Sequence, residues 1–377
     1  MKKILSLFLP LLLLLACFPV LPAAADEVTL SAPSAVLMEA STGRVLFEKD
    51  PHAVRPCASI TKVMTLCLTF DAIEDGRLTM DQFLTASAHA ASMGGSDIWL
   101  KEGESMTVDD LIKAAVIMSA NDAAVVLAEN VAGSEEAFVQ LMNEKARALG
   151  MEDTVFKNCN GLDEEGHVTS AYDVALMSRE LIRHEKIFDY TLTWIDYLRD
   201  GATQLVNTNK LIRSYSGITG LKTGTTSQAG SCITATAERN GLSLISVILG
   251  ADSTEHRFQD AAALLDYGFA GWAVVQPESP VLEDLPVTGG MEESVPVQAG
   301  EMPKILLEAG KAGKVEQSVA LSKELAAPIK AGDTVGRITY TAGGETVAQV
   351  DITAAADVEA ITFKSALRFI LQNFFAW

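Results

Sequence analysis

Apolar residues and turn signals combine in two regions that lie far apart in the chain. Residues 35–38 and 45–47 are apolar and flank a turn that ends in Gly43, which predicts a β-hairpin. Residues 217–250 have an extended pattern again, and the pair Asn240-Gly241 within them predicts a tight turn. We therefore expect antiparallel strands at both ends of this part of the chain.

Between these two regions the apolar spacing is mostly helical, over residues 59–188. Two buried helical segments, marked by residues 111–118 and 127–131, are interrupted at residues 119–122, where Ser, Asn and Asp favour caps and turns. Strands that flank a long helical insertion predict an α+β domain, in which an antiparallel sheet packs against helices. We expect this first domain to span residues 26–275.

The pattern changes after Trp272. Prolines and glycines interrupt an acidic stretch, and residues 296–356 show short alternations such as Arg337-Ile338-Thr339-Tyr340. These alternations predict a second, smaller, β-rich domain over residues 276–360.

The tail, residues 361–377, predicts an amphipathic helix. At 100° per residue one stripe of it is apolar, made of Phe363, Leu367, Ile370, Phe374 and Trp377. The tail is too short and too polar to span a membrane, and it has two cations and no acidic residue. We interpret it as a helix that lies on the membrane surface; the alternative is a terminal helix packed on its own domain.

The first 25 residues have the pattern of a secretory signal peptide. Two lysines precede an almost unbroken apolar run, and three alanines end at residue 25, which predicts cleavage before Asp26 and export. Two alternatives remain, namely a retained membrane anchor and lipidation at Cys17. The export prediction places the mature protein on the outer face of the cytoplasmic membrane, attached through its tail.

Composition and charge restrict the possible partners. The chain has 377 residues, of which 49% are hydrophobic, enough for two cores. Removing residues 1–25 deletes two of the 29 basic residues and none of the 49 acidic ones, which leaves a formal charge of −22. Such a surface repels nucleic acid. Four scattered cysteines remain and look like buried thiols, and the scattered His and Cys predict neither a metal site nor a cofactor.

The segment "SITK" combines a hydroxyl and an amine at the start of an apolar helical stretch. Because residues i and i+3 share a helical face, Ser59 and Lys62 are expected within hydrogen-bonding reach. Serine is a nucleophile only when a base takes its proton, and lysine can be that base when burial or a nearby cation lowers its pKa. The alternative is a capping serine beside a solvated lysine.

Two further short motifs favour the catalytic interpretation of Ser59 and Lys62 over this alternative. Ser119-Ala120-Asn121 falls at the break between the buried helices, and Lys222-Thr223-Gly224 ends a strand. Apart from Ala120, where the signature has Asp, the three motifs in this order resemble the signature of penicillin-binding proteins and class A β-lactamases.

The resemblance extends through residues 30–270. The chain is similar to the low-molecular-mass D-alanyl-D-alanine carboxypeptidases, a family of serine peptidases, in the region around Arg257 and in the segments "RPCASITKVMT", "GGSDIWLKEGE", "MSANDAA", "NGLDEEGHVTSAYDVALMSREL", "NTNKLI" and "GLKTGTTSQAGSCITATAERNGLSLISVILGA". It implies a β-lactamase/transpeptidase-like fold, with the β-rich domain and tail of the family layout. Cys57 and Cys159 stand where the family usually has proline, and neither replaces a catalytic group.

The resemblance also implies roles for the residues of the motifs. Ser59 would attack the penultimate D-alanine of a peptidoglycan stem peptide, with neutral Lys62 as the base, and form an acyl-enzyme. Ser119 would pass a proton to the leaving amine, and Asn121 would hold Lys62 and the substrate amide. Lys222 would add positive potential that helps to keep Lys62 uncharged. β-Lactam antibiotics would be covalent inhibitors.

The remaining motif residues are expected to bind substrate. Backbone N–H groups of Ser59 and Thr225 would form the oxyanion hole, and Thr223 and Arg257 would bind the terminal carboxylate. Arg257 has an alternative as a surface arginine that opens a helix. Position 224 is expected to need a residue as small as Gly224, because the substrate strand approaches the backbone there.

His167 and Asp173 are interpreted as supports of a helix that starts near Ser170. A DD-endopeptidase that cuts cross-links uses the same groups and stays an alternative. A β-lactamase of class A is disfavoured because members of that class use a glutamate in a Glu-x-x-Leu-Asn loop. The chain has no Leu-Asn dipeptide. A non-catalytic wall-binding protein is disfavoured because the residues expected to do chemistry are present.

Overall fold

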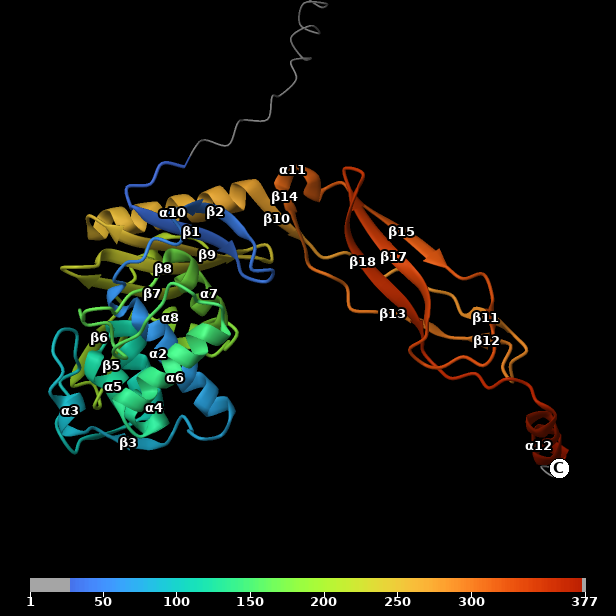
Figure 1. The fold of residues 1–377 in the computed structure, drawn as a ribbon, viewed down its shortest axis with the longest axis horizontal. Helices are drawn as coiled ribbons and strands as arrows, with labels where there is room; N and C mark the ends of the chain where they lie inside the picture. The colour runs from blue at the N-terminus through green and yellow to red at the C-terminus, as the bar shows by residue number, and fades with distance from the viewer. Residues whose placement is uncertain (1–27, 375–377) are drawn as a thin grey trace, which may run out of the picture.

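The computed structural model describes residues 28–374, which form two parts joined by one pair of strands (Figure 1). The predicted signal peptide, residues 1–25, and the last three residues of the tail lie outside this described part. In Figure 1 the larger part lies on the left, the β-rich part extends away from it, and the C-terminal helix is at the far end.

The larger part is built on a five-stranded antiparallel sheet with the order β2-β1-β9-β8-β7. Its strands are β1 (Ser34–Glu39), β2 (Val45–Lys49), β7 (Ile218–Thr226), β8 (Gly230–Arg239) and β9 (Leu242–Ala251). The predicted hairpin is confirmed as β1–β2, with Gly43 at φ +74° in its turn. The Asn240-Gly241 turn joins β8 to β9, and both residues have a positive φ. Strands from both ends of this part therefore lie side by side.

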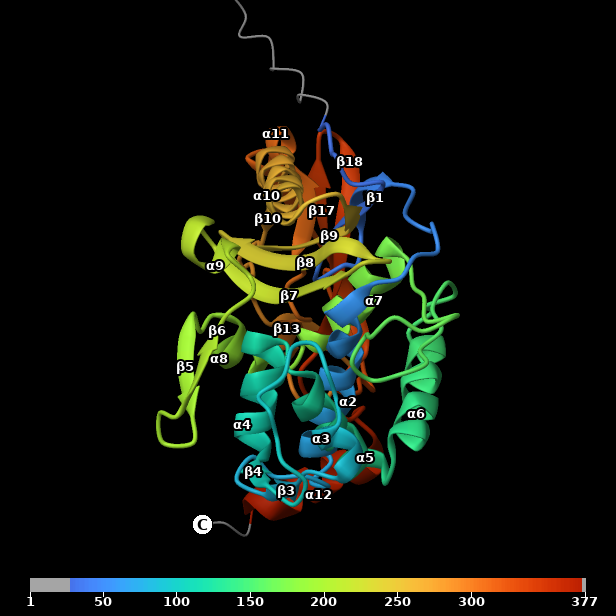
Figure 2. The same cartoon turned by 90° about the vertical axis from the view of Figure 1, so that its left-hand side faces the viewer.

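The two faces of this sheet carry separate hydrophobic cores. Alternate side chains point to opposite faces, so Leu37 packs against helix α10 (Thr254–Gly271), whereas Val36 and Met38 belong to the core under the helices. Figure 2 shows α10 above the sheet and the helical part below it. This arrangement confirms the predicted α+β class.

The helical part lies between β2 and β7 in sequence. Its helices are α2 (Lys62–Glu74), α3 (Ala88–Ala91), α4 (Val108–Lys113), α5 (Asn121–Ala132), α6 (Glu135–Ala148), α7 (Ala171–Leu181), α8 (Ile187–Thr191) and α9 (Leu211–Ser214), with a 3₁₀ turn at Ala58–Thr61 and a π-helical turn at Ala114–Met118. Two small two-stranded sheets pair β3 (Phe83–Thr85) with β4 (Ser105–Thr107) and β5 (Ile195–Leu198) with β6 (Thr203–Val206). The first nine residues of α2 are buried, as expected of a largely apolar helical stretch.

The smaller part is built almost entirely of strands around its own core. A four-stranded sheet has the order β13-β18-β17-β15, and β11 pairs with β12 and with β16. The elements are β11 (Leu285–Thr288), β12 (Ser294–Val295), β13 (Val297–Ala299), β15 (Val315–Leu321), β16 (Leu325–Ala326), β17 (Thr334–Ala342), β18 (Glu345–Ala354) and the short helix α11 (Ala309–Ala312). The two parts are joined where β10 (Trp272–Val275) pairs with β14 (Ile305–Glu308).

Residues Phe363–Phe374 form helix α12 at the C-terminal end of the described chain. Its side chains include exposed apolar ones, with Phe363 86% and Ile370 58% exposed. Within residues 28–374, no helix combines the length and the hydrophobicity that crossing a membrane requires.

Candidate active site

Ser59 and Lys62 meet at the start of α2, as their spacing predicted. Ser59 lies in the 3₁₀ turn Ala58–Thr61, and Lys62 is the first residue of α2. The Nζ atom of Lys62 lies 3.1 Å from Oγ of Ser59. Ala58, directly before Ser59, has φ +49°, a left-handed conformation that costs energy for a residue with a Cβ.

Lys62 is completely buried, and its amine faces three oxygen atoms. Besides Ser59, Nζ donates to Oδ1 of Asn121 at 2.5 Å and to the backbone O of Asn160 at 2.7 Å. Burial lowers the pKa of Lys62 to about 7. The two carbonyl oxygens can only accept, so they take both N–H groups of a neutral amine. The remaining lone pair of the amine then faces the Ser59 hydroxyl.

Ser119 and Lys222 form a second hydroxyl–amine pair opposite the first. Ser119 stands between the π-helical turn and α5 with φ +66°, and Lys222 comes from β7. The Lys222 Nζ atom donates to Ser119 Oγ at 2.8 Å and to the backbone O of Thr223 at 2.9 Å. Three motifs that are distant in sequence therefore reach one location.

The electrostatics of the two lysines are linked. Burial holds the pKa of Lys222 well below its usual range, and the charges of Lys62 and Arg257 lower it further. Two buried ammonium groups would repel each other and would each lose hydration. Proton loss from one of the two amines removes this repulsion, so the environment favours the uncharged form of one of them.

Asn121 is held from two sides at the N-terminus of α5. Its backbone N–H donates to the O of Ser96 at 2.6 Å, and its side-chain Nδ2 donates to the O of Gly94 at 2.6 Å. Because Nδ2 is engaged there, Oδ1 is the atom that faces Lys62. The predicted contact between Asn121 and Lys62 is present.

The end of β7 packs directly on the turn that carries Ser59. A Cβ on Gly224 would lie 2.8 Å from the O of Cys57 and 2.9 Å from the N of Ser59. The protein itself therefore requires glycine here, in addition to the substrate contact that the sequence suggested. Thr223 is buried and donates through Oγ1 to Oγ1 of Thr208 at 2.7 Å.

Arg257 is buried on α10, which corrects the alternative of a surface arginine. Its Nη1 donates to Oγ1 of Thr225 at 2.8 Å and to the O of Gly224 at 3.1 Å. The guanidinium thus orients an exposed hydroxyl at the end of β7.

One group in the site was not found from the sequence. The backbone oxygen of Asn160 binds Lys62, and a backbone atom leaves no residue-type signal. The neighbouring Gly161 is the one sequence signal of this close approach, because a Cβ at that position would lie 2.0 Å from the O of Ala58. Gly161 has φ +88°, which also favours glycine.

His167 was interpreted wrongly as a support of the helix at Ser170. Ser170 does cap α7, because its Oγ accepts the N–H of Asp173 at 3.2 Å. His167 instead lies with Nε2 2.7 Å from Oγ1 of Thr61, in the turn that carries Ser59. The Asp173 carboxylate accepts from the Asp153 N–H. The four cysteines of the described chain are free and buried, as expected.

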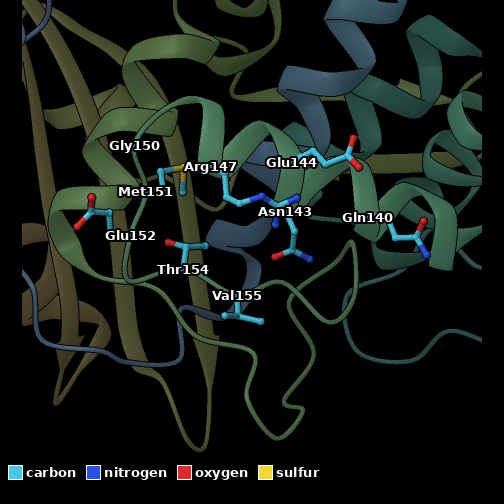
Figure 3. Close-up of a pocket in the computed structure, with 9 residues that line it drawn as sticks. All are labelled: Gln140, Asn143, Glu144, Arg147, Gly150, Met151, Glu152, Thr154 and Val155. Carbon is cyan, nitrogen blue, oxygen red and sulfur yellow. The ribbon is translucent and has the colours of Figure 1, made fainter.

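A surface hollow of 730 Å³ lies elsewhere, between α6 and residues 150–155 (Figure 3). Its lining residues are Gln140, Asn143, Glu144, Arg147, Gly150, Met151, Glu152, Thr154 and Val155. None of these belongs to the three motifs. Its size alone therefore does not make it the reactive site.

Comparisons with known proteins agree with this geometry. Residues 21–253 match the sequence profile of a family described as D-alanyl-D-alanine carboxypeptidase, and residues 274–360 match the penicillin-binding protein 5 C-terminal domain. The chain is 37% identical over 379 residues to the D-alanyl-D-alanine carboxypeptidase DacF of Bacillus subtilis (strain 168), covering 98% of this chain and 97% of that protein.

Solved structures show the same similarity. Penicillin binding protein 5 from Haemophilus influenzae matches with a TM-score of 0.73 and 27% identity, over 90% of this chain and 100% of that chain. Penicillin-Binding Protein D2 from Listeria monocytogenes, in its ampicillin-bound form, matches with a TM-score of 0.60 and 34% identity, over 65% of this chain and 100% of that chain. Profile, identity and fold together establish that the chain belongs to the D-alanyl-D-alanine carboxypeptidases, serine peptidases that act through an acyl-enzyme.

Proposed function

We propose that this carboxypeptidase uses Ser59 as its nucleophile to remove the terminal D-alanine from peptidoglycan stem pentapeptides. The observation that carries the proposal is the buried Lys62 amine, 3.1 Å from Oγ of Ser59, with its two other contacts on oxygens that can only accept. An amine held in this way is ready to take a proton from the hydroxyl.

In the acylation step, Oγ of Ser59 forms a bond to the carbonyl carbon of the penultimate D-alanine as its proton passes to Nζ of Lys62. The carbonyl oxygen becomes an oxyanion, for which the N–H groups of Ser59 and Thr225 are the proposed donors. A donor of this kind typically contributes about 3–4 kcal/mol to transition-state stabilisation.

The C–N bond then breaks, and the leaving amine needs a proton. Ser119 is the proposed donor, because its hydroxyl accepts from Lys222 at 2.8 Å and can be reprotonated by it. The proton that Lys62 took from Ser59 then replaces the one that Lys222 lost, which leaves Lys62 neutral again. In the second half of the reaction water attacks the ester and gives a proton to Lys62, which returns it to Oγ of Ser59 as the ester bond breaks. The shortened peptide leaves, and Ser59 is restored.

Recognition of the terminal carboxylate is assigned to positive potential and hydroxyl donors at the end of β7. Lys222 and Thr223 are adjacent on this strand, and Arg257 donates to the exposed Thr225 hydroxyl at 2.8 Å. A free carboxylate next to the scissile bond distinguishes a terminal D-alanine from an internal residue. Cleavage of cross-links, the endopeptidase alternative, uses the same catalytic groups.

A fluorescent penicillin tests the assignment of Ser59. Wild-type protein should become covalently labelled, Ser59→Ala should not, and the exposed Ser318→Ala should label like wild type. The assignment fails if a folded Ser59→Ala sample still labels. Comparing D-alanine release from a pentapeptide with cleavage of a cross-linked dimer then separates carboxypeptidase from endopeptidase activity.

We also propose that the protein is exported and that α12 holds it on the outer face of the cytoplasmic membrane. The support is the amphipathic sequence of the tail and the exposure of Phe363, Ile370 and Leu371. Deleting residues 361–377 should release the mature protein from anionic lipid vesicles in a flotation assay. Equal flotation of the full-length and shortened proteins would exclude this role for the tail.

A further inference from the structure

His167 is a buried histidine that the proposed reaction does not use. It is 4% exposed, and both of its ring nitrogens have partners. The backbone N–H of Lys157 donates to Nδ1 at 3.1 Å, so Nδ1 is the acceptor. The hydrogen of a neutral ring is therefore on Nε2, which donates to Oγ1 of Thr61 at 2.7 Å.

Thr61 passes this contact on to the residue before Ser59. Its hydroxyl donates to the O of Ala58 at 2.9 Å, while its oxygen accepts from His167. Ala58 is the residue held at φ +49°, so its carbonyl and the next peptide unit are kept in a conformation that the chain does not prefer. The direction of that peptide sets where Ser59 points.

His167 belongs to the loop between α6 and α7, and this loop makes two further contacts, with Lys62 at the start of α2 and with Ala58 in the turn that carries Ser59. The O of Asn160 binds Nζ of Lys62 at 2.7 Å, and Gly161 packs against the O of Ala58. One loop therefore positions both the nucleophile and its base, and His167 is the member that acts through a side chain.

We infer that His167 is a positioning residue, which holds the strained Ala58–Ser59 turn through Thr61 and so keeps Oγ of Ser59 aligned with Lys62. This inference rests on the proposed role of Ser59. Small displacements of a nucleophile cost large factors in rate, because acylation requires the attacking atom close to the carbonyl carbon and correctly aligned. His167 has no hydrogen bond to Ser59 or Lys62, so it acts on them only through Thr61.

Two substitutions separate positioning from general stability. In His167→Gln the amide N–H can take the place of Nε2–H and donate to Thr61, but the acceptor for Lys157 is lost. In His167→Asn the amide oxygen can keep the acceptor for Lys157, but the donor to Thr61 is lost. Each variant loses one hydrogen bond, so both should lower the melting temperature by similar amounts.

The first-order acylation rate of the mature, full-length protein with penicillin should distinguish them. We expect His167→Asn to acylate about tenfold more slowly than wild type and His167→Gln within about threefold, which are the effects of losing or keeping one aligned hydrogen bond. The Kd of the complex before acylation should not change, because the His167 side chain is buried behind Thr61.

Thr61→Val provides the second measurement. If His167 acts through Thr61, the double variant Thr61→Val/His167→Asn should be no slower than Thr61→Val alone. The inference is overturned if His167→Asn acylates like wild type, if the Asn and Gln variants are slowed equally, or if the two changes multiply. Absence of acylation in wild type would instead refute the proposed role of Ser59, and this inference with it.

Discussion

At the scale of single residues, the site depends on two lysines that are buried without a carboxylate partner. Lys62 and Lys222 are 0% and 2% exposed, and their hydrogen bonds go to hydroxyl, amide and backbone oxygens. Burying an ammonium in such surroundings is unfavourable, which is why their pKa values fall. The same cost makes an amine available as a base at neutral pH.

The pH dependence of acylation follows from this. Because the base must be uncharged and burial lowers the pKa of Lys62 to about 7, the acylation rate should level off above that pH. Below it, the rate should fall roughly tenfold per pH unit. Stopped-flow fluorescence with penicillin from pH 5 to 9 measures the profile, with circular dichroism to confirm folding. A rate that stays flat or rises on acidification would contradict the role of Lys62.

Gly224→Ala should disturb the nucleophile without adding any charge. The new Cβ would lie within 3.0 Å of the O of Cys57 and the backbone N atoms of Ser59 and Ile60, so β7 and the turn must separate. Overpacking of this kind typically costs about 1–3 kcal/mol in the free energy of unfolding, and acylation should slow as well. Urea unfolding and penicillin labelling measure the two effects. Gly271→Ala, which has open space around its Cβ, is the control.

The sequence predicted the side chains of the site better than its backbone. Spacing alone brought Ser59 and Lys62 together, because i and i+3 share a helical face. It could not predict the carbonyl of Asn160, since every residue type offers the same oxygen. His167 was misjudged because its partner Thr61 lies 106 positions away, and sequence periodicity reports only near neighbours.

At the scale of elements, turn chemistry was the strongest predictor. Gly43 and Asn240-Gly241 marked the two hairpins correctly, because both turns need residues with positive φ. The break at residues 119–122 was also predicted. The π-helical turn Ala114–Met118, which brings Ser119 into place, was not, because its residues are ordinary helix formers.

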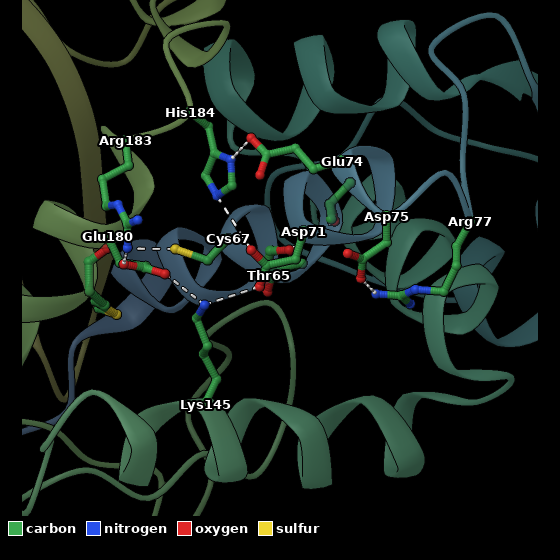
Figure 4. A network of polar contacts seen from close by, with 12 residues as sticks. Thr65, Cys67, Asp71, Glu74, Asp75, Arg77, Lys145, Glu180, Arg183 and His184 are labelled. Carbon is green, nitrogen blue, oxygen red and sulfur yellow. Dashed lines mark hydrogen bonds and ion pairs between the residues drawn. The ribbon is translucent and has the colours of Figure 1, made fainter. Parts of the chain in front are cut away.

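Helices α2, α6 and α7 are joined by a network of charges (Figure 4). Lys145 on α6 contacts Asp71 on α2 and Glu180 on α7. His184, after α7, contacts Asp71 and Glu74 at the end of α2. Two hydrogen bonds raise the pKa of His184 although burial acts to lower it: the one to Asp71 has the larger effect and the one to Glu74 the smaller. The network therefore ties the far end of α2 to its neighbours.

This network should make stability depend on pH in a defined direction. The pKa of His184 is higher in the folded protein than in the unfolded chain. Its contribution to the free energy of unfolding is therefore complete below the unfolded pKa of about 6.5, and it is lost as pH rises through the folded pKa. Urea unfolding should thus show a larger deficit of His184→Gln relative to wild type at pH 6 than at pH 9. Arg183→Gln, which removes a cation that does not titrate in this range, should give equal deficits at both values. Equal deficits for His184→Gln would show that its charge contributes nothing.

At the scale of the whole molecule, the two parts are coupled through one strand pair. The pattern change after Trp272 predicted a second, β-rich part, but it did not predict that β10 would pair with β14 across 29 intervening residues. Trp272 and Val274 also pack with Leu306 against the core between the sheet and α10. The smaller part thus covers one end of the core of the larger part, while the proposed catalytic and substrate-binding groups all come from residues 59–257.

Removal of the smaller part should therefore separate stability from chemistry. Deleting residues 276–377 leaves β10 unpaired and exposes Trp272 and Val274, which should lower the free energy of unfolding by about 1–3 kcal/mol for the apolar area returned to water. Acylation by penicillin should stay within about threefold of full length, because a threefold change is well under 1 kcal/mol in the barrier. Deleting only residues 361–377 keeps β14 and should change neither quantity. A folded 26–275 fragment that no longer acylates would mean that the smaller part helps to form the reactive site.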